Sequence, residues 1–175
     1  MGLKYLAGYS PIVVEKIQAL IDNGQLAAYI QKKYPQLHQV KTDKALYEFV
    51  LTVKNRYLRQ SAPLSKVIYD DKLDVLHQAL GLHSFVSRVQ GGRLKAKHEI
   101  RIGGVFRTAP AEFLQMIVAH ELAHLREKEH NKAFYQLCLH IEPNYHQLEF
   151  DVRLYLTCLE KGLILDAATN KAVLP

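Results

Sequence analysis

The chain has 175 residues, of which 49 % are hydrophobic and 23 % charged, proportions typical of ordered globular proteins. A chain of this length buries a stable core without a metal ion or disulfides to hold it together, and no apolar run approaches the length of a membrane span. Lys and Arg exceed Asp and Glu by 23 − 17 = 6. This charge permits an anionic partner such as a nucleotide or nucleic acid without requiring one, because no nucleic-acid-binding motif accompanies the scattered basic residues.

The N-terminal segment has neither a continuous apolar stretch nor a small-residue cleavage site, so we expect a cytoplasmic protein. Cys138 and Cys158 lack the spacing of metal ligands and are expected to be reduced thiols. We further expect a monomer that does not associate with membranes.

Helical patterns dominate the first sixty residues. Residues 11–34 predict two short helices broken at Asn23-Gly24, and residues 43–59 predict a longer amphipathic helix. Pro63 follows Ser61 and Ala62, and proline cannot continue a helix. We therefore predict an N-terminal helical lobe of residues 1–62 and a core of residues 63–175.

The core begins with a different pattern. Residues 71–80 predict a short helix that ends at Gly81, and the strand-like runs 84–90 and 94–102 flank Gly91-Gly92 as in a hairpin. Residues 111–125 then predict a helix with Pro110 in its first turn and Thr108 as its cap. Two more helices are expected, over 131–140 and 145–156.

The helix over 111–125 carries the sequence His120-Glu121-Leu122-Ala123-His124. Successive helical residues are about 100° apart, so His120 and His124 share one face and can bind one zinc ion. Glu121 lies one step round the helix, where it can act as a general base toward a zinc-activated water. A random arrangement of this composition gives such a pattern in roughly 3 % of cases, and the apolar residues around it indicate a buried helix in which the histidines need a partner.

A catalytic zinc normally takes three protein ligands. His130 is the nearest candidate, but an unbroken helix would carry it about 240° away from His124, so the helix must end between the two. The polar stretch 126–129 and the capping residue Asn131 make such a turn plausible. Glu142 and Glu149 are the alternative third ligands.

The HELAHL sequence of residues 120–125, followed by His130, Phe134 and Pro143-Asn144-Tyr145, resembles the YgjP-like metallopeptidase family, which is related to the WLM and SprT-like zincins. The similarity extends over about residues 65–157. It implies an α+β fold with a minimal zincin-like core, in which a small antiparallel sheet packs on the motif helix. Residues 98–104 would form the edge strand along the cleft, where glycines let a substrate backbone approach.

A zincin also needs a group that stabilises the developing oxyanion. Tyr145, His146 and Arg153 are the candidates, although each is individually more typical of an ordinary structural or surface residue. Glu149 and Asp151 are candidates for orienting a ligating histidine, and the residues around Phe134 are most simply core packing.

These observations leave three functions open. The first is a zinc metallopeptidase that cleaves peptide bonds. The second is a metal-dependent hydrolase of a nucleotide or phosphate ester at the same site, for which scattered Lys and Arg residues would have to converge on the cleft. The third is a non-enzymatic binding protein with structural zinc, which Glu121 and the open fourth ligand position argue against.

Overall fold

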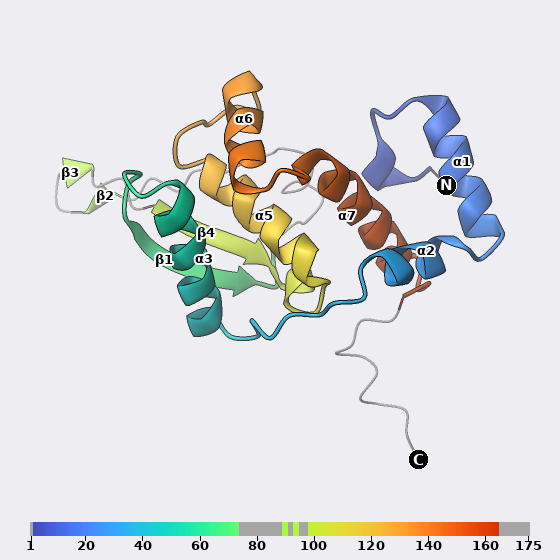
Figure 1. The fold of residues 1–175 in the computed structure, drawn as a ribbon, viewed down its shortest axis with the longest axis horizontal. Coiled ribbons are helices and arrows are strands. Elements are labelled where there is room, and N and C mark those ends of the chain that lie inside the picture. Colours follow the sequence, from blue (N-terminus) through green and yellow to red (C-terminus); the bar gives the residue numbers. More distant parts are fainter. Residues whose placement is uncertain (1, 74–88, 91–92, 95–97, 165–175) are drawn as a thin grey trace, which may run out of the picture.

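The structure is a computed structural model, and it describes residues 2–73, 89–90, 93–94 and 98–164 (Figure 1). Its N-terminal part is helical, as predicted. A 3-10 turn η1 (Lys4–Leu6) precedes the helices α1 (Pro11–Asp22), α2 (Leu26–Lys33) and α3 (Asp43–Tyr57). The side chains of Ser10 and Thr42 accept hydrogen bonds from the first turns of α1 and α3. The break between α1 and α2 falls at Gly24, whose φ of +67° suits glycine.

Two strands form the sheet beside the motif helix. β1 (Leu64–Asp70) pairs with β4 (His98–Gly103) in parallel, with Val67 opposite Ile100. The expectation of an antiparallel sheet is therefore wrong for this pair, and the sequence analysis did not predict β1 at all. Its alternating buried residues Val67 and Tyr69 are the signal that would have located it.

The predicted hairpin around Gly91-Gly92 is confirmed where the structure describes it, because β2 (Val89–Gln90) pairs antiparallel with β3 (Arg93–Leu94). The predicted helix over 71–80 lies outside the described residues from residue 74 onward, and residues 71–73 form a turn. Residues 84–88 and 95–97 of the two strand-like runs also lie outside them.

The second half of the chain is helical again. After the short 3-10 helix η2 (Gly104–Arg107) come α5 (Ala111–Ala123), α6 (Lys132–Ile141) and α7 (Tyr145–Glu160). Pro110 occupies the N-cap of α5, so the prediction that Thr108 caps this helix is wrong. α7 extends four residues beyond the predicted end at Leu156.

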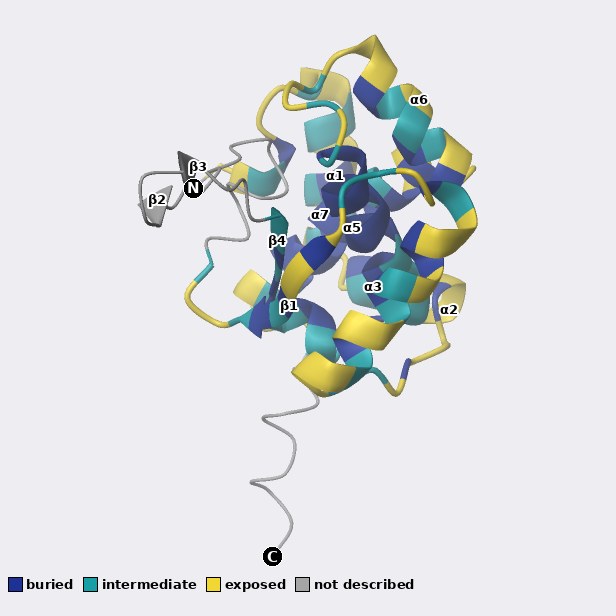
Figure 2. Ribbon diagram, turned by 90° about the vertical axis from the view of Figure 1, so that its left-hand side faces the viewer, coloured by how far each residue is buried: buried dark blue, intermediate teal, exposed yellow. Residues whose placement is uncertain are grey.

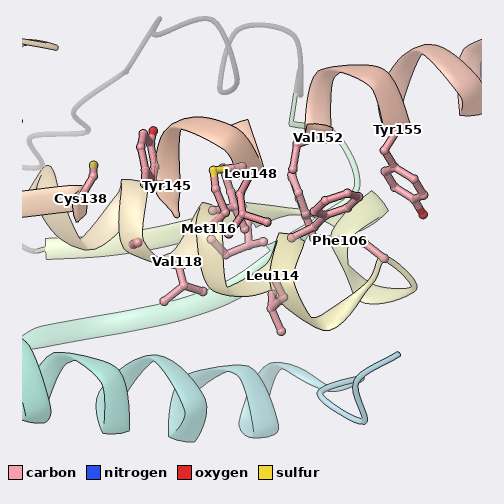
Figure 3. Packing of buried hydrophobic residues seen from close by; sticks show 14 of the residues in the cluster. Phe106, Leu114, Met116, Val118, Cys138, Tyr145, Leu148, Val152 and Tyr155 are labelled. Atoms are coloured by element: carbon pink, nitrogen blue, oxygen red, sulfur yellow. The ribbon is translucent and has the colours of Figure 1, made fainter. Parts of the chain in front are cut away.

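α5 is the central element of the core. It contacts β4, α6 and α7, and Figure 2 shows it as buried. In Figure 3, Met116 points toward Leu148 of α7, whereas Leu114 and Val118 point to the opposite side of α5. A helix that buries apolar side chains all round its axis is enclosed by other elements, so the histidine motif at its C-terminal end lies on a rigid support.

The N-terminal helices pack onto this core. α3 lies against β1 and α2 against α7, and the ring of Tyr34 contacts that of Phe113 in α5 at 4.7 Å. The backbone N–H of Ala111 donates to the carbonyl of Gln36. The fold is thus α+β, as predicted. No helix in the described ranges is long and apolar enough to cross a bilayer.

Candidate metal centre

His120 and Glu121 occupy the last turn of α5. Their side chains are almost fully buried, with relative exposures of 6 % and 5 %. The helix gives them this burial because ten of its thirteen residues pack into the core. Burial lowers the local dielectric around both groups and so strengthens the electrostatic interactions they make.

The chain leaves the helical path directly after Ala123. His124 is the C-cap of α5, and the N–H groups of Leu125 and Arg126 bond back to the carbonyls of Leu122 and Ala123. This tight turn returns the chain to the same face of the helix before α6 begins. His130 therefore lies beside the two motif histidines, and the required helix end is present.

The three histidines face one another through their Nε2 atoms. The Nε2 atom of His124 lies 3.2 Å from Nε2 of His120 and 3.0 Å from Nε2 of His130. The candidate ligand atoms of the three residues all lie within 4.8 Å of one another. Within the described residues, neither Glu142 nor Glu149 joins this group.

In His120 and His124 the other ring nitrogen, Nδ1, also has a hydrogen-bonding partner. Nδ1 of His124 lies 2.8 Å from the carbonyl oxygen of Glu127, and Nδ1 of His120 lies 2.7 Å from the hydroxyl of Tyr145. A carbonyl only accepts, so Nδ1 of His124 carries a proton and its Nε2 presents a lone pair. Burial lowers the pKa of His130, although the charge of Glu149 opposes the shift, and this favours the neutral ring that metals bind.

A metal ion fits this arrangement. Tetrahedral zinc with Zn–N bonds of about 2.0–2.1 Å places its nitrogen ligands about 3.3 Å apart, close to the two separations found here. The ring of Phe134 contacts all three imidazoles, at centroid distances of 5.0, 4.6 and 4.6 Å. The donor set is thus buried, convergent and held in position, and nitrogen ligands of this type suit zinc and other transition metals.

The structure places the other candidate residues at different distances from this cluster. Tyr145 is fully buried and contacts His120 directly. His146 is exposed and packs on Tyr135, with ring centroids 5.3 Å apart. The Arg153 guanidinium donates to the carbonyl of Tyr5 and to Glu149, which directs it toward η1.

The two remaining acidic candidates differ. Glu149 carries a charge that reaches the cluster, because it opposes the lowering of the His130 pKa by burial and adds to the raising of the Tyr145 pKa by burial. Asp151 instead accepts hydrogen bonds from Lys33, Tyr34 and Gln147, so it joins α7 to α2 and does not orient a histidine. Sequence reasoning missed the carbonyl of Glu127, because any residue could supply that atom.

The three-histidine cluster, on a chain that matches a metallopeptidase family model, indicates a metal-dependent hydrolase. The chain matches the model of the YgjP-like metallopeptidase domain over residues 21–152, and it belongs to the YgjP-like family. It is also similar to the UTP pyrophosphatase of Escherichia coli (strain K12), with 58 % identity over 161 residues that cover 92 % of this chain and 96 % of the relative. No solved structure gives a significant match.

Proposed function

We propose that this protein is a metal-dependent pyrophosphatase of nucleoside triphosphates, with UTP as the first substrate to test. The proposal rests on the similarity to a UTP pyrophosphatase over nearly the whole of both chains and on the buried three-histidine cluster. The excess of six positive charges also favours a polyanionic substrate over a neutral peptide. The comparison thus favours the second of the three functions left open by the sequence.

His120, His124 and His130 would hold the metal ion, for which we propose zinc. Such an ion supplies Lewis-acid chemistry, polarising a phosphoryl oxygen and lowering the pKa of water. Glu121 would take a proton from the attacking water and return it to the leaving group. The water oxygen bonds to the α-phosphorus while the bond to the bridging oxygen breaks, which gives a nucleoside monophosphate and pyrophosphate.

A panel of nucleoside triphosphates offered to the zinc-loaded protein tests this function. We expect pyrophosphate release from UTP in stoichiometric amounts with UMP. A parallel panel of unstructured peptides tests the metallopeptidase, which remains the second candidate because the family description names that activity. Peptide cleavage without pyrophosphate release would contradict the proposal and favour the peptidase.

Substitution of Glu121 separates catalysis from metal binding. We expect Glu121→Gln to retain about one metal ion per chain while kcat falls by about 10²- to 10⁴-fold, the usual contribution of a general base. Elemental mass spectrometry measures the metal and pyrophosphate release measures kcat. Glu112→Gln, in the first turn of the same helix, is the matched control and should keep both.

The histidines provide the converse test. A His120→Ala/His124→Ala double variant should lose the metal, because it removes two of the three converging ring nitrogens. A double variant that still binds one zinc ion per chain, or a wild-type protein that takes up none, would contradict the proposed site.

A further inference from the structure

A buried thiol lies near the contact between Tyr145 and His120. The Tyr145 hydroxyl is 2.7 Å from Nδ1 of His120, and Cys138 is close enough to Tyr145 to affect the pKa of its hydroxyl. Tyr145 and Cys138 are both fully buried, and Figure 3 shows their side chains near the same end of α5. The three residues come from α5, α6 and α7, so all three helices contribute a side chain here.

The direction of hydrogen bonding follows from the chemistry of each atom. If Nε2 of His120 is to present a lone pair to a metal, Nδ1 must carry the proton of the neutral ring and donate it to the Tyr145 oxygen. The hydroxyl of Tyr145 then directs its own proton to another acceptor. The neighbouring sulfur of Cys138 is a weak acceptor. Burial raises the pKa of the Cys138 thiol to about 12, so it is present as the neutral thiol.

We propose that Tyr145 is a positioning residue for the metal site, which holds His120 with its proton on Nδ1, and that Cys138 supports this role by accepting the Tyr145 proton. Without an acceptor at Cys138, the hydroxyl is free to turn and donate to Nδ1 instead. That reversal would place the His120 proton on Nε2, the atom that faces the other two histidines. This inference rests on the proposed metal site and is independent of which substrate is hydrolysed.

The role differs from that of an oxyanion stabiliser, which the sequence analysis considered for Tyr145. The hydroxyl lies on the ring nitrogen opposite Nε2, so it acts on the metal through His120. Partners on the far nitrogen of ligating histidines fix the tautomer and ring orientation, and their loss typically weakens metal affinity by about 10- to 100-fold. Glu127 supplies the same support to His124 through its backbone carbonyl.

Four variants test the proposal: Tyr145→Phe, Cys138→Ala, Cys138→Ser and Tyr135→Phe. The first removes the hydroxyl, and the two Cys138 variants form a pair in which only serine keeps an acceptor. Tyr135→Phe is the control, since Tyr135 lies in the same aromatic group, 6.2 Å from Tyr145 between ring centroids. Zinc affinity is measured by competition with a chelating indicator, and the tautomer of His120 by nitrogen-15 NMR of the metal-free protein at pH 8.

We expect Tyr145→Phe and Cys138→Ala to bind zinc about 10- to 100-fold more weakly and to lose the preference for the Nδ1–H tautomer. Cys138→Ser and Tyr135→Phe should resemble the wild type in both measurements. Unchanged affinity and tautomer in Tyr145→Phe would overturn the proposal, as would equal effects of alanine and serine at Cys138. If Tyr145→Phe does not fold, the Cys138 pair alone decides, because its comparison leaves Tyr145 in place.

These measurements do not depend on the proposed function. The tautomer of His120 in metal-free protein can be read whether or not UTP is hydrolysed. An inactive protein with the expected tautomers would contradict the proposed activity and support the positioning role. An active protein whose Tyr145→Phe variant keeps the tautomer and the zinc affinity would do the reverse.

Discussion

His38 is buried between the N-terminal helices and the start of α5, and both its ring nitrogens are hydrogen bonded. Nδ1 accepts from the backbone N–H of Val40 at 3.0 Å, so Nε2 carries the proton and donates to the carbonyl of Phe106 at 2.8 Å. Protonation of Nδ1 would make it a donor that faces the N–H of Val40, which is also a donor. Burial is the largest cause that lowers the pKa of His38, and the nearby charge of Lys41 lowers it further.

This environment predicts a loss of stability in acid. The folded-state pKa lies below the unfolded value of about 6.5, so between the two values the unfolded chain binds more protons. The contribution of His38 is therefore fully present above about pH 6.5 and is lost as the pH falls toward the folded-state pKa. Urea unfolding at pH 5.0 and 7.5 should show a smaller pH dependence for His38→Gln than for the wild type.

His140 supplies the control for that experiment. It is exposed on α6, where its ring packs edge-on against Tyr57. His140→Gln should leave the pH dependence of unfolding as it is in the wild type. A His38→Gln variant with the same pH dependence as the wild type would show that His38 titrates alike in the folded and unfolded chains.

The residues of the metal cluster were predictable from sequence to different degrees. The spacing of His120 and His124 fixes their common face in any helix, and His130 follows once the helix ends after His124. The contact between Tyr145 and His120 joins residues 25 positions apart, and no local pattern encodes it. Arg153 and His146 were equally good candidates from sequence, and only packing separates them from Tyr145.

At the scale of elements, the helices were predicted well because their signals are local. Ser10, Thr42 and Asn131 cap the helices that follow them, and the apolar periodicity covers each helix. The pairing of β1 with β4 was not predictable, because the two strands are far apart in sequence and Leu64 lies opposite His98. The antiparallel expectation came from the family resemblance, and no local signal corrected it, because parallel strands are joined by a long connection and not by a tight hairpin.

The turn between α5 and α6 depends on Asn131. Its side-chain oxygen accepts from the N–H of Phe134 at 2.9 Å, and its amide donates to the Glu127 carboxylate at 3.1 Å. One side chain therefore caps α6 and holds the residue whose carbonyl supports His124. We expect Asn131→Ala to reduce the free energy of unfolding by about 1 kcal/mol through loss of the cap, and to weaken zinc binding because the turn loosens.

Asn131→Ser distinguishes the two contacts. Serine is as good a cap as asparagine but cannot reach the Glu127 carboxylate with an amide. In thermal or urea unfolding, Asn131→Ser should therefore be about as stable as the wild type. In a zinc titration it should bind zinc as weakly as Asn131→Ala does. If serine and alanine lose the same stability, the cap does not account for the effect.

At the scale of the whole molecule, the N-terminal helices and α5, the helix that bears His120, pack into one core. Asp151 of α7 has no exposed side-chain surface, and it accepts from the Lys33 ammonium at 2.7 Å and from the Tyr34 hydroxyl. The ring of Tyr34 in turn lies on Phe113 of α5. These contacts connect α2 to α7 and to α5, the helix that bears His120. The predicted lobe of residues 1–62 therefore has a structural connection to the site.

Asp151→Ala tests how tightly the two parts are coupled. The substitution leaves the buried hydroxyl of Tyr34 and the partly buried Lys33 without their acceptor, and we expect it to lower the free energy of unfolding by about 3 kcal/mol. Because α2 packs on α7 and α3 on β1, urea unfolding followed by circular dichroism should remain a single transition. Asp22→Ala is the control, since Asp22 is exposed and accepts a hydrogen bond from Gln18 within α1. Two separate transitions, with only the first shifted by Asp151→Ala, would instead establish residues 1–62 as an independently unfolding lobe.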